Sequence, residues 1–238
     1  MFSHKGRTRT QRHNLGIASL LSFVAGLVNV VGFFSVQKLT TNVTGHFAYF
    51  VDEAFKQDFT GAFHVALYIF FFFLGAFFSN FTVEIYSRIR ENQIYVVPAV
   101  TEAVILAVIA FTGSFLMKEH PDVIAFSLLF AMGMQNALVT SISQAVVRTT
   151  HLTGLFTDMG IEFSQLFFYR DREHKRKLIK SIKLRLTSIW MFFGGGVTGG
   201  ILYGYLGIKA LIFGSLILLL GLLYDFVKIR ILLLRRKI

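Results

Sequence analysis

The stretch FVAGLVNVVGFFSVQKLTTNVTGHF, residues 23–47, returns in altered form as FAMGMQNALVTSISQAVVRTTHLTGLF, residues 130–156. At an offset of 107 residues, the identical positions are Phe23, Gly26, Asn29 and Gln37, matched by Phe130, Gly133, Asn136 and Gln144. An insertion of two residues changes the offset to 109, and the next identities are Thr40, Thr41, Thr44, Gly45 and Phe47, matched by Thr149, Thr150, Thr153, Gly154 and Phe156. A weaker match at an offset of 120 pairs FFLG, residues 72–75, with FFGG, residues 192–195. The chain is therefore predicted to contain two copies of one unit.

The composition is that of a membrane protein. Hydrophobic residues make up 54% of the 238 residues and charged residues only 16%, with 28 Phe. A soluble domain carries about 25% charged residues. Cysteine is absent, which excludes a disulfide framework and metal–thiolate sites. A duplicated unit inside a membrane is typical of transporters built from repeats.

Six apolar stretches are long enough to span a bilayer, which takes about 20 helical residues. They cover residues 15–36, 62–86, 94–117, 121–147, 186–207 and 209–231. Runs such as YIFFFFLGAFF do not alternate as the strands of a β-barrel would. We therefore expect an all-α integral membrane protein with one membrane domain over residues 1–238. Its two three-helix repeats are expected at about 14–117 and 121–231, with a basic tail at 1–13 and a basic loop at 170–185.

The positions of Lys and Arg predict the orientation. The N-terminal tail, the second and fourth connections and the C-terminal end hold four, two, eight and five of them, whereas the odd-numbered connections hold Lys56, Lys118 and Lys209. Basic loops stay in the cytoplasm, so both termini are expected there. The same bias explains the net charge of +11 without a nucleic-acid partner. Because each copy holds an odd number of spans, the second copy should be inverted relative to the first.

The repeated motif combines small, amide and hydroxyl side chains. Gly26 and Gly133 lie one turn before Asn29 and Asn136, which suits close helix packing with polar groups inside the bundle. The Thr-rich run ending in Gly favours a broken segment with glycine at positive φ, and new helices are expected after Gly45 and after the second Thr-Gly. The two copies should face each other across a polar cavity near the bilayer midplane. The alternative is that the motif only packs helices together. The candidate solute-binding residues are Asn29, Thr41, Asn42, Thr44, Gly45, Gln135, Asn136, Thr150, His151, Thr153 and Gly154.

The motifs GMQNA, residues 133–137, and TTHLTG, residues 149–154, resemble those of the YoaK family of bacterial multipass membrane proteins. The resemblance covers roughly residues 14–230 and implies a bacterial inner-membrane protein, but it implies no substrate. The first copy departs from the family pattern. Asn29-Val30 stands where the family commonly has Asp-Ala, and Val43-Thr44-Gly45-His46 stands where it has Met-Thr-Gly-Asn. A carboxylate in the first span is therefore missing from this chain.

Few ionisable side chains fall inside the predicted spans. Glu102 has apolar neighbours on both sides and is the candidate for proton coupling, with a buried structural role as the alternative. His151 could bind an anion or simply end a helix. Asp158 and Glu162 could line an ion path, although a solvated helix face explains them as well. The Gly-rich stretch 192–207 lacks GK[ST], so it predicts close helix packing, within the bundle or between two protomers, rather than phosphate binding.

Three classes of function remain open. The first is a secondary transporter or exporter of a small polar solute by alternating access at the repeat interface, which the paired polar motifs favour. The second is an intramembrane enzyme, although neither HExxH nor GxSxG occurs in the chain. The third is a membrane scaffold or assembly factor. We expect no cofactor, no metal and no nucleic acid, and the expected partners are the lipid bilayer, the solute and a second protomer through residues 186–207.

Overall fold

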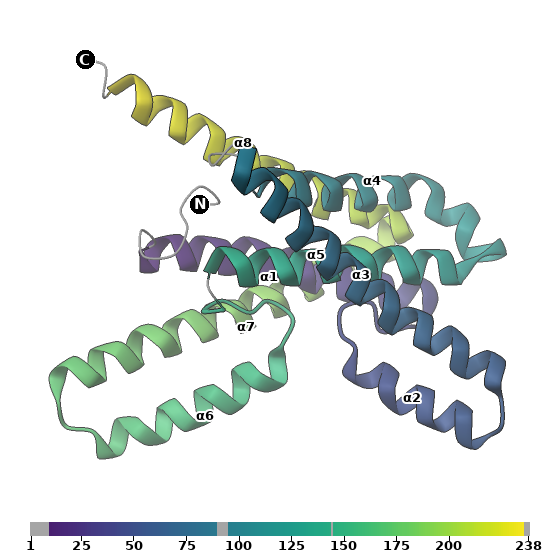
Figure 1. The fold of residues 1–238 in the computed structure, drawn as a ribbon, viewed down its shortest axis with the longest axis horizontal. Helices are drawn as coiled ribbons and strands as arrows, with labels where there is room; N and C mark the ends of the chain where they lie inside the picture. Colours follow the sequence, from purple (N-terminus) through teal and green to yellow (C-terminus); the bar gives the residue numbers. More distant parts are fainter. Residues whose placement is uncertain (1–9, 90–94, 144, 236–238) are drawn as a thin grey trace.

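The computed structural model describes residues 10–89, 95–143 and 145–235, which form helices joined by short connections, with no β-strand among them (Figure 1). The basic tail up to residue 9 and the basic residues Arg90, Arg236 and Lys237 lie outside the described ranges. A short 3₁₀ helix, Gly207–Ala210, follows the seventh helix. The α-helices are α1 (Gln11–Val36), α2 (Thr44–Phe55), α3 (Phe59–Ile89), α4 (Val96–Glu119), α5 (Pro121–Ser143), α6 (Leu152–Phe168), α7 (Arg172–Leu206) and α8 (Leu211–Arg235).

Within the described ranges, five helical stretches are long and apolar enough to cross a membrane. Four of them are single helices, α1, α3, α4 and α5. The fifth, Arg172–Lys228, is 57 residues long and contains α7, the 3₁₀ helix and most of α8. The sequence therefore predicted the helical class correctly, and the long apolar helices, which coincide with the apolar stretches that it marked, are consistent with the predicted membrane protein.

Four glycines hold the helices in two equivalent pairs. In the first pair, α1 with α7, a Cβ atom placed on Gly26 of α1 would lie 1.9 Å from the Phe192 carbonyl oxygen of α7. A Cβ atom placed on Gly195 of α7 would lie 1.9 Å from the Phe23 carbonyl oxygen of α1. The second pair, α5 with α3, repeats this contact through Gly133 with Phe72 and Gly75 with Phe130, each at 2.0 Å. These are the residues that the two copies share. Each copy's motif helix therefore packs against a helix of the other copy, with backbones too close for any side chain.

The two motif helices lie at the centre of the bundle and run in opposite directions. Gln135 of α5 donates from its Nε2 to the Leu21 carbonyl oxygen near the start of α1, at 2.8 Å. A Cβ atom on Gly32, near the end of α1, would lie 3.0 Å from Leu128, which precedes Gln135 on α5. Both α1 and α5 are lined by fully buried apolar side chains and are surrounded by α3, α4, α7 and α8 (Figure 1).

After each motif helix the chain turns sharply and a shorter helix leaves the bundle. Gln37 (φ 54°) ends α1 and donates its N–H to the Phe33 carbonyl oxygen at 2.8 Å. Ala145 (φ 62°) follows α5 and donates to the Thr140 carbonyl oxygen at 2.9 Å. In Figure 1 the helices α2 and α6 begin near the middle of the molecule and diverge as two arms towards its opposite ends.

Two local expectations were wrong. The helices α2 and α6 begin before Gly45 and Gly154, and neither glycine has a positive φ. Both serve packing instead, because a Cβ atom would lie 2.4 Å from Leu39 Cδ1 at Gly45 and 2.2 Å from the His151 ring at Gly154.

The segment expected as a basic loop at 170–185 is helical from Arg172 onward. Asp171 caps it by accepting the His174 N–H at 2.8 Å. The Lys, Arg and Leu residues that follow are good helix formers, so their charge does not prevent a helix.

Candidate functional site

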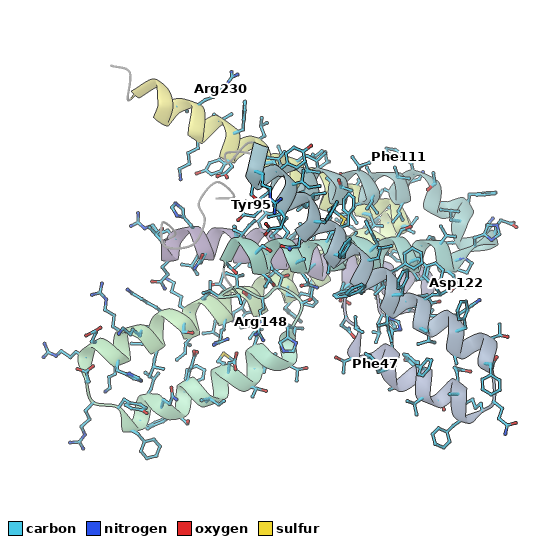
Figure 2. The ribbon with its side chains drawn as sticks, in the orientation of Figure 1. Phe47, Tyr95, Phe111, Asp122, Arg148 and Arg230 are labelled. Carbon is cyan, nitrogen blue, oxygen red and sulfur yellow. The ribbon has the colours of Figure 1, made fainter. Side chains whose placement is uncertain are left out.

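A cavity of about 380 Å³ opens where the two motif copies meet. The first copy contributes the segment that enters α2, and the second contributes part of α5 and the segment that enters α6. In Figure 2 the label of Phe47 marks the first turn of α2, and that of Arg148 marks the inner end of the α6 arm. The described residues that line the cavity are Thr41, Asn42, Val43, Thr44, Phe72, Asn136, Val139, Thr140, Arg148, Thr150 and His151.

Equivalent hydrogen bonds position the two returning segments. In the first copy the Thr41 hydroxyl donates to Asn29 Oδ1 at 2.7 Å. In the second copy the Thr150 hydroxyl donates to Asn136 Oδ1 at 2.8 Å, joined by Thr149 at 3.3 Å. Each bond connects the segment after a motif helix to the middle of that helix. The Asn and Thr side chains that both copies share therefore hold each segment beside its own helix, although the second copy has two more residues between them.

The cavity brings together some of the predicted binding residues and leaves out others. Those that line it are Thr41, Asn42, Thr44, Asn136, Thr150 and His151. The others lie behind the lining or pack helices. Asn29 positions Thr41, Gln135 connects α5 to α1, and Gly45 packs beside Leu39. Thr153 and Gly154 lie in the first turn of α6, next to His151 but outside the lining.

Glu102 lies away from this cavity, on α4. It is completely buried, and neither carboxyl oxygen has a hydrogen-bond partner among the described residues. The helix α4 packs against α5 and α8, and next to Glu102 the Ala103 carbonyl oxygen accepts from Ser215 of α8 at 2.7 Å. A carboxyl group buried in this way is costly to ionise unless water or a cation reaches it.

The carboxylates of Asp158 and Glu162, which were predicted to line an ion path or a solvated helix face, both bind an arginine. Arg185 of α7 donates to Asp158 at 2.7 Å and to Glu162 at 3.0 Å, and Ser181 donates to Glu162 at 2.6 Å. These bonds fasten α6 to the charged first half of α7. Asp158 and Glu162 therefore form an ion-pair cluster between two helices. A second cavity of about 320 Å³ lies beside this cluster and is lined by Ala145, Val146, Arg148, Asp158, Ser181 and Arg185.

Arg148 is a site residue that the sequence reasoning passed over. It lines both cavities, and it has no ion pair or hydrogen bond with any described residue. Arg148 is exposed, and its position immediately before Thr149-Thr150 was the available signal, since it puts a permanent charge directly beside a predicted binding motif.

His46 is the second such residue. It is buried at the start of α2 and donates from Nε2 to the Leu39 carbonyl oxygen at 2.7 Å, while its Nδ1 has no partner among the described residues. Its ring lies 5.1 Å from that of Tyr68, whose hydroxyl donates to Asp122. Burial lowers the pKa of His46, the hydrogen bond to Leu39 opposes this, and the charge of Lys38 lowers the pKa further. The signal was its place in the motif, where the YoaK pattern has Asn.

The central cavity is lined mainly by uncharged polar side chains. Its polar groups are hydroxyls, amides, one imidazole and one guanidinium, and no carboxylate is among the described lining residues. Among the residues that the structure describes, no group of three or more His, Asp or Glu could hold a metal ion. Hydroxyls and amides can replace the hydration shell of a small polar solute.

Comparison with known proteins places the chain in a family. No curated protein and no solved structure matches it. One family model matches residues 17–224, which cover both motif copies and all the helices that line the cavity. Its description reads "Protein of unknown function (DUF1275)", so it confirms an uncharacterised family but not the YoaK name. The chain belongs to the DUF1275 family of proteins of unknown function.

Proposed function

We propose that this protein is a secondary transporter of a small polar solute and that the solute binds in the central cavity between the two motif copies. The observation that carries the proposal is the cavity itself, because residues of both copies line it and both diverging helices begin beside it. In transporters built from inverted repeats, the solute site lies at the interface between the repeats.

The packing supports an architecture of six spans in two inverted repeats. The glycine contacts pair each motif helix with a helix of the other copy, and α1 and α5 are antiparallel. In this arrangement α1, α3 and α4 span the membrane in the first repeat and α5, α7 and α8 in the second. The arms α2 and α6 begin at the level of the cavity and extend towards opposite faces. The charge bias then puts both termini of this bacterial inner-membrane protein in the cytoplasm.

Alternating access follows from two arms of similar build. Thr–Asn hydrogen bonds hold both arms, one in the first copy and two in the second, and a neutral hydrogen bond contributes about 0.5–1.5 kcal/mol. Their other contacts differ. The arm α6 is fastened to α7 by the Arg185 ion pairs, whereas α2 packs along α3. Movement of one arm at a time would open the cavity to one side of the membrane.

A flux measurement tests the proposal. Liposomes that contain the purified protein are loaded with labelled small polar metabolites. The metabolites are those whose uptake or efflux differs between a deletion strain and its parent. We expect saturable flux of at least one solute, and we expect Asn136→Leu together with Thr150→Val to reduce it. Liposomes without protein are the control. Absence of protein-dependent flux for every solute that distinguishes the two strains would refute transport and leave a scaffold.

Proton coupling through Glu102 belongs to the same proposal. Gln has the shape of Glu without its titrating proton, and Glu102 makes no hydrogen bond to a described residue that the change would break. We expect Glu102→Gln to fold normally, to retain exchange flux and to lose the dependence of net flux on a pH gradient. The measurement is flux with and without an imposed gradient, and an unchanged gradient dependence would assign Glu102 a structural role.

A further inference from the structure

We infer that the solute bound in the central cavity carries a carboxylate, and that the guanidinium of Arg148 binds it. This inference rests on the transport function proposed above and names the chemical class of the solute. Of the described residues that line the cavity, Arg148 is the one with a permanent charge. It lies in the segment between α5 and α6.

Arg148 has no acidic partner among the described residues, whereas several cations near the two arms do. Lys56 pairs with Asp52 at 2.5 Å and Lys177 with Glu173 at 2.8 Å. Asp158 lines the adjacent cavity together with Arg148, but its carboxylate is bound by Arg185 at 2.7 Å. The guanidinium of Arg148 is exposed and makes no hydrogen bond or ion pair with a described residue, so a solute in the cavity can reach it. A guanidinium matches the two oxygens of a carboxylate with two parallel hydrogen bonds.

The surrounding backbone favours the same charge. Val43 and His151 are the residues that precede the first turns of α2 and α6, both line the cavity, and neither helix has a side-chain cap. The first amide N–H groups of both helices are therefore left for water or a ligand, and the partial positive charge of each helix start adds to that of Arg148.

The size and walls of the cavity limit the rest of the solute. A volume of about 380 Å³ lies at the lower end of the range for small-molecule sites, roughly 300–1,000 Å³. Phe72 and Val139 supply an apolar wall, while Thr41, Thr44 and Thr140 supply hydroxyls. These features fit a small hydroxy acid, dicarboxylic acid or amino acid, in which a compact body follows the carboxylate.

The test compares acids with their neutral amides. Purified protein in detergent at fixed salt is titrated with lactate and lactamide, succinate and succinamide, and glycine and glycinamide, and binding is read from the shift in unfolding temperature. We expect at least one acid, and not its amide, to stabilise the protein. Arg148→Gln should weaken binding of that acid about tenfold to a hundredfold, and Arg148→Lys should restore part of the loss. Arg88→Gln, an exposed arginine of α3 remote from the cavity, should leave binding unchanged.

Three results would overturn the inference. They are an amide that binds as tightly as its acid, an Arg148→Gln protein that binds the acid like the wild type, and a panel in which no acid binds. Failure of the transport proposal would look different. In that case the acid would bind, Arg148→Gln would abolish binding, and no labelled acid would cross liposomes that contain the wild-type protein.

Discussion

At the scale of single residues, the cavity separates two threonines that the repeat makes equivalent. Thr44 lines the cavity, whereas Thr153 lies in the first turn of α6, outside the lining. Val has the shape of Thr without the hydroxyl. We expect Thr44→Val to reduce flux about twofold to tenfold, the value of one neutral hydrogen bond, and Thr153→Val to have a smaller effect. Flux per amount of folded protein in liposomes is the measurement, and equal losses in both variants would mean that the lining has been assigned to the wrong residues.

His46 gives the first arm a dependence on pH. Burial lowers its pKa below the ordinary value of 6.5, and Lys38 acts in the same direction. The groups that face it are the Tyr68 ring of α3 and, on its own helix, Tyr49, and neither carries a negative charge at neutral pH. The folded protein therefore binds this proton less readily than the unfolded chain, so the contribution of His46 to stability is present above about pH 6.5 and is lost as the pH falls towards the lowered pKa.

We expect the unfolding temperatures of the wild type and His46→Gln to depend differently on pH. Between pH 7.5 and pH 5.5, the unfolding temperature of the wild type should fall more steeply than that of His46→Gln. The Gln side chain keeps an N–H donor for the Leu39 carbonyl oxygen but cannot titrate. The two proteins have the same remaining residues, so the difference between their curves isolates His46. Parallel curves would show that protonation of His46 does not affect folding.

At the scale of helices, the close approach of α7 to α1 is the contact most sensitive to added volume. A Cβ atom on Gly195 would lie 1.9 Å from a backbone oxygen, which cannot move aside as a flexible side chain can. The adjacent Gly194 has nothing within 4 Å. We expect Gly195→Ala to destabilise the protein by about 1–3 kcal/mol and Gly194→Ala to be neutral or slightly stabilising. Thermal unfolding in one detergent measures both, and equal effects would contradict the glycine pairing.

The helices show which features could be predicted from the sequence. Long apolar stretches predicted α1, α3, α4, α5 and α8 because the bilayer requires a minimum length of apolar helix. The arms α2 and α6 were expected only as new helices after the motif, since each is too short for that length signal. The charged start of α7 was taken for a loop, because charge marks exposure to water and not the absence of a helix.

The site was predictable in part for a similar physical reason. The repeat identified Thr41, Asn136 and Thr150, because a polar residue retained in both copies inside a bundle has either a bonding or a binding role. It could not identify Arg148 or His46, since neither residue has an identical counterpart in the other copy. These two residues are where the arms differ in chemistry. The repeat thus predicts the shared framework of the cavity, whereas the charge that Arg148 adds to the lining lies at a position where the copies differ.

At the scale of the whole molecule, the proposed transport mechanism requires that the second copy enters the membrane from the opposite side. The connection between α2 and α3 contains Lys56, and the first half of α7 contains Lys177, the equivalent place on the other arm. Both side chains are exposed, so replacing them removes only a surface ion pair of small value. Because the chain has no cysteine, Lys56→Cys and Lys177→Cys each create a single labelling site. In intact cells with a permeable outer membrane, a maleimide that cannot cross the inner membrane should label Lys56→Cys and leave Lys177→Cys unlabelled until the cells are opened. Labelling of both from the same side would place an even number of spans between them and remove the inversion on which alternating access depends.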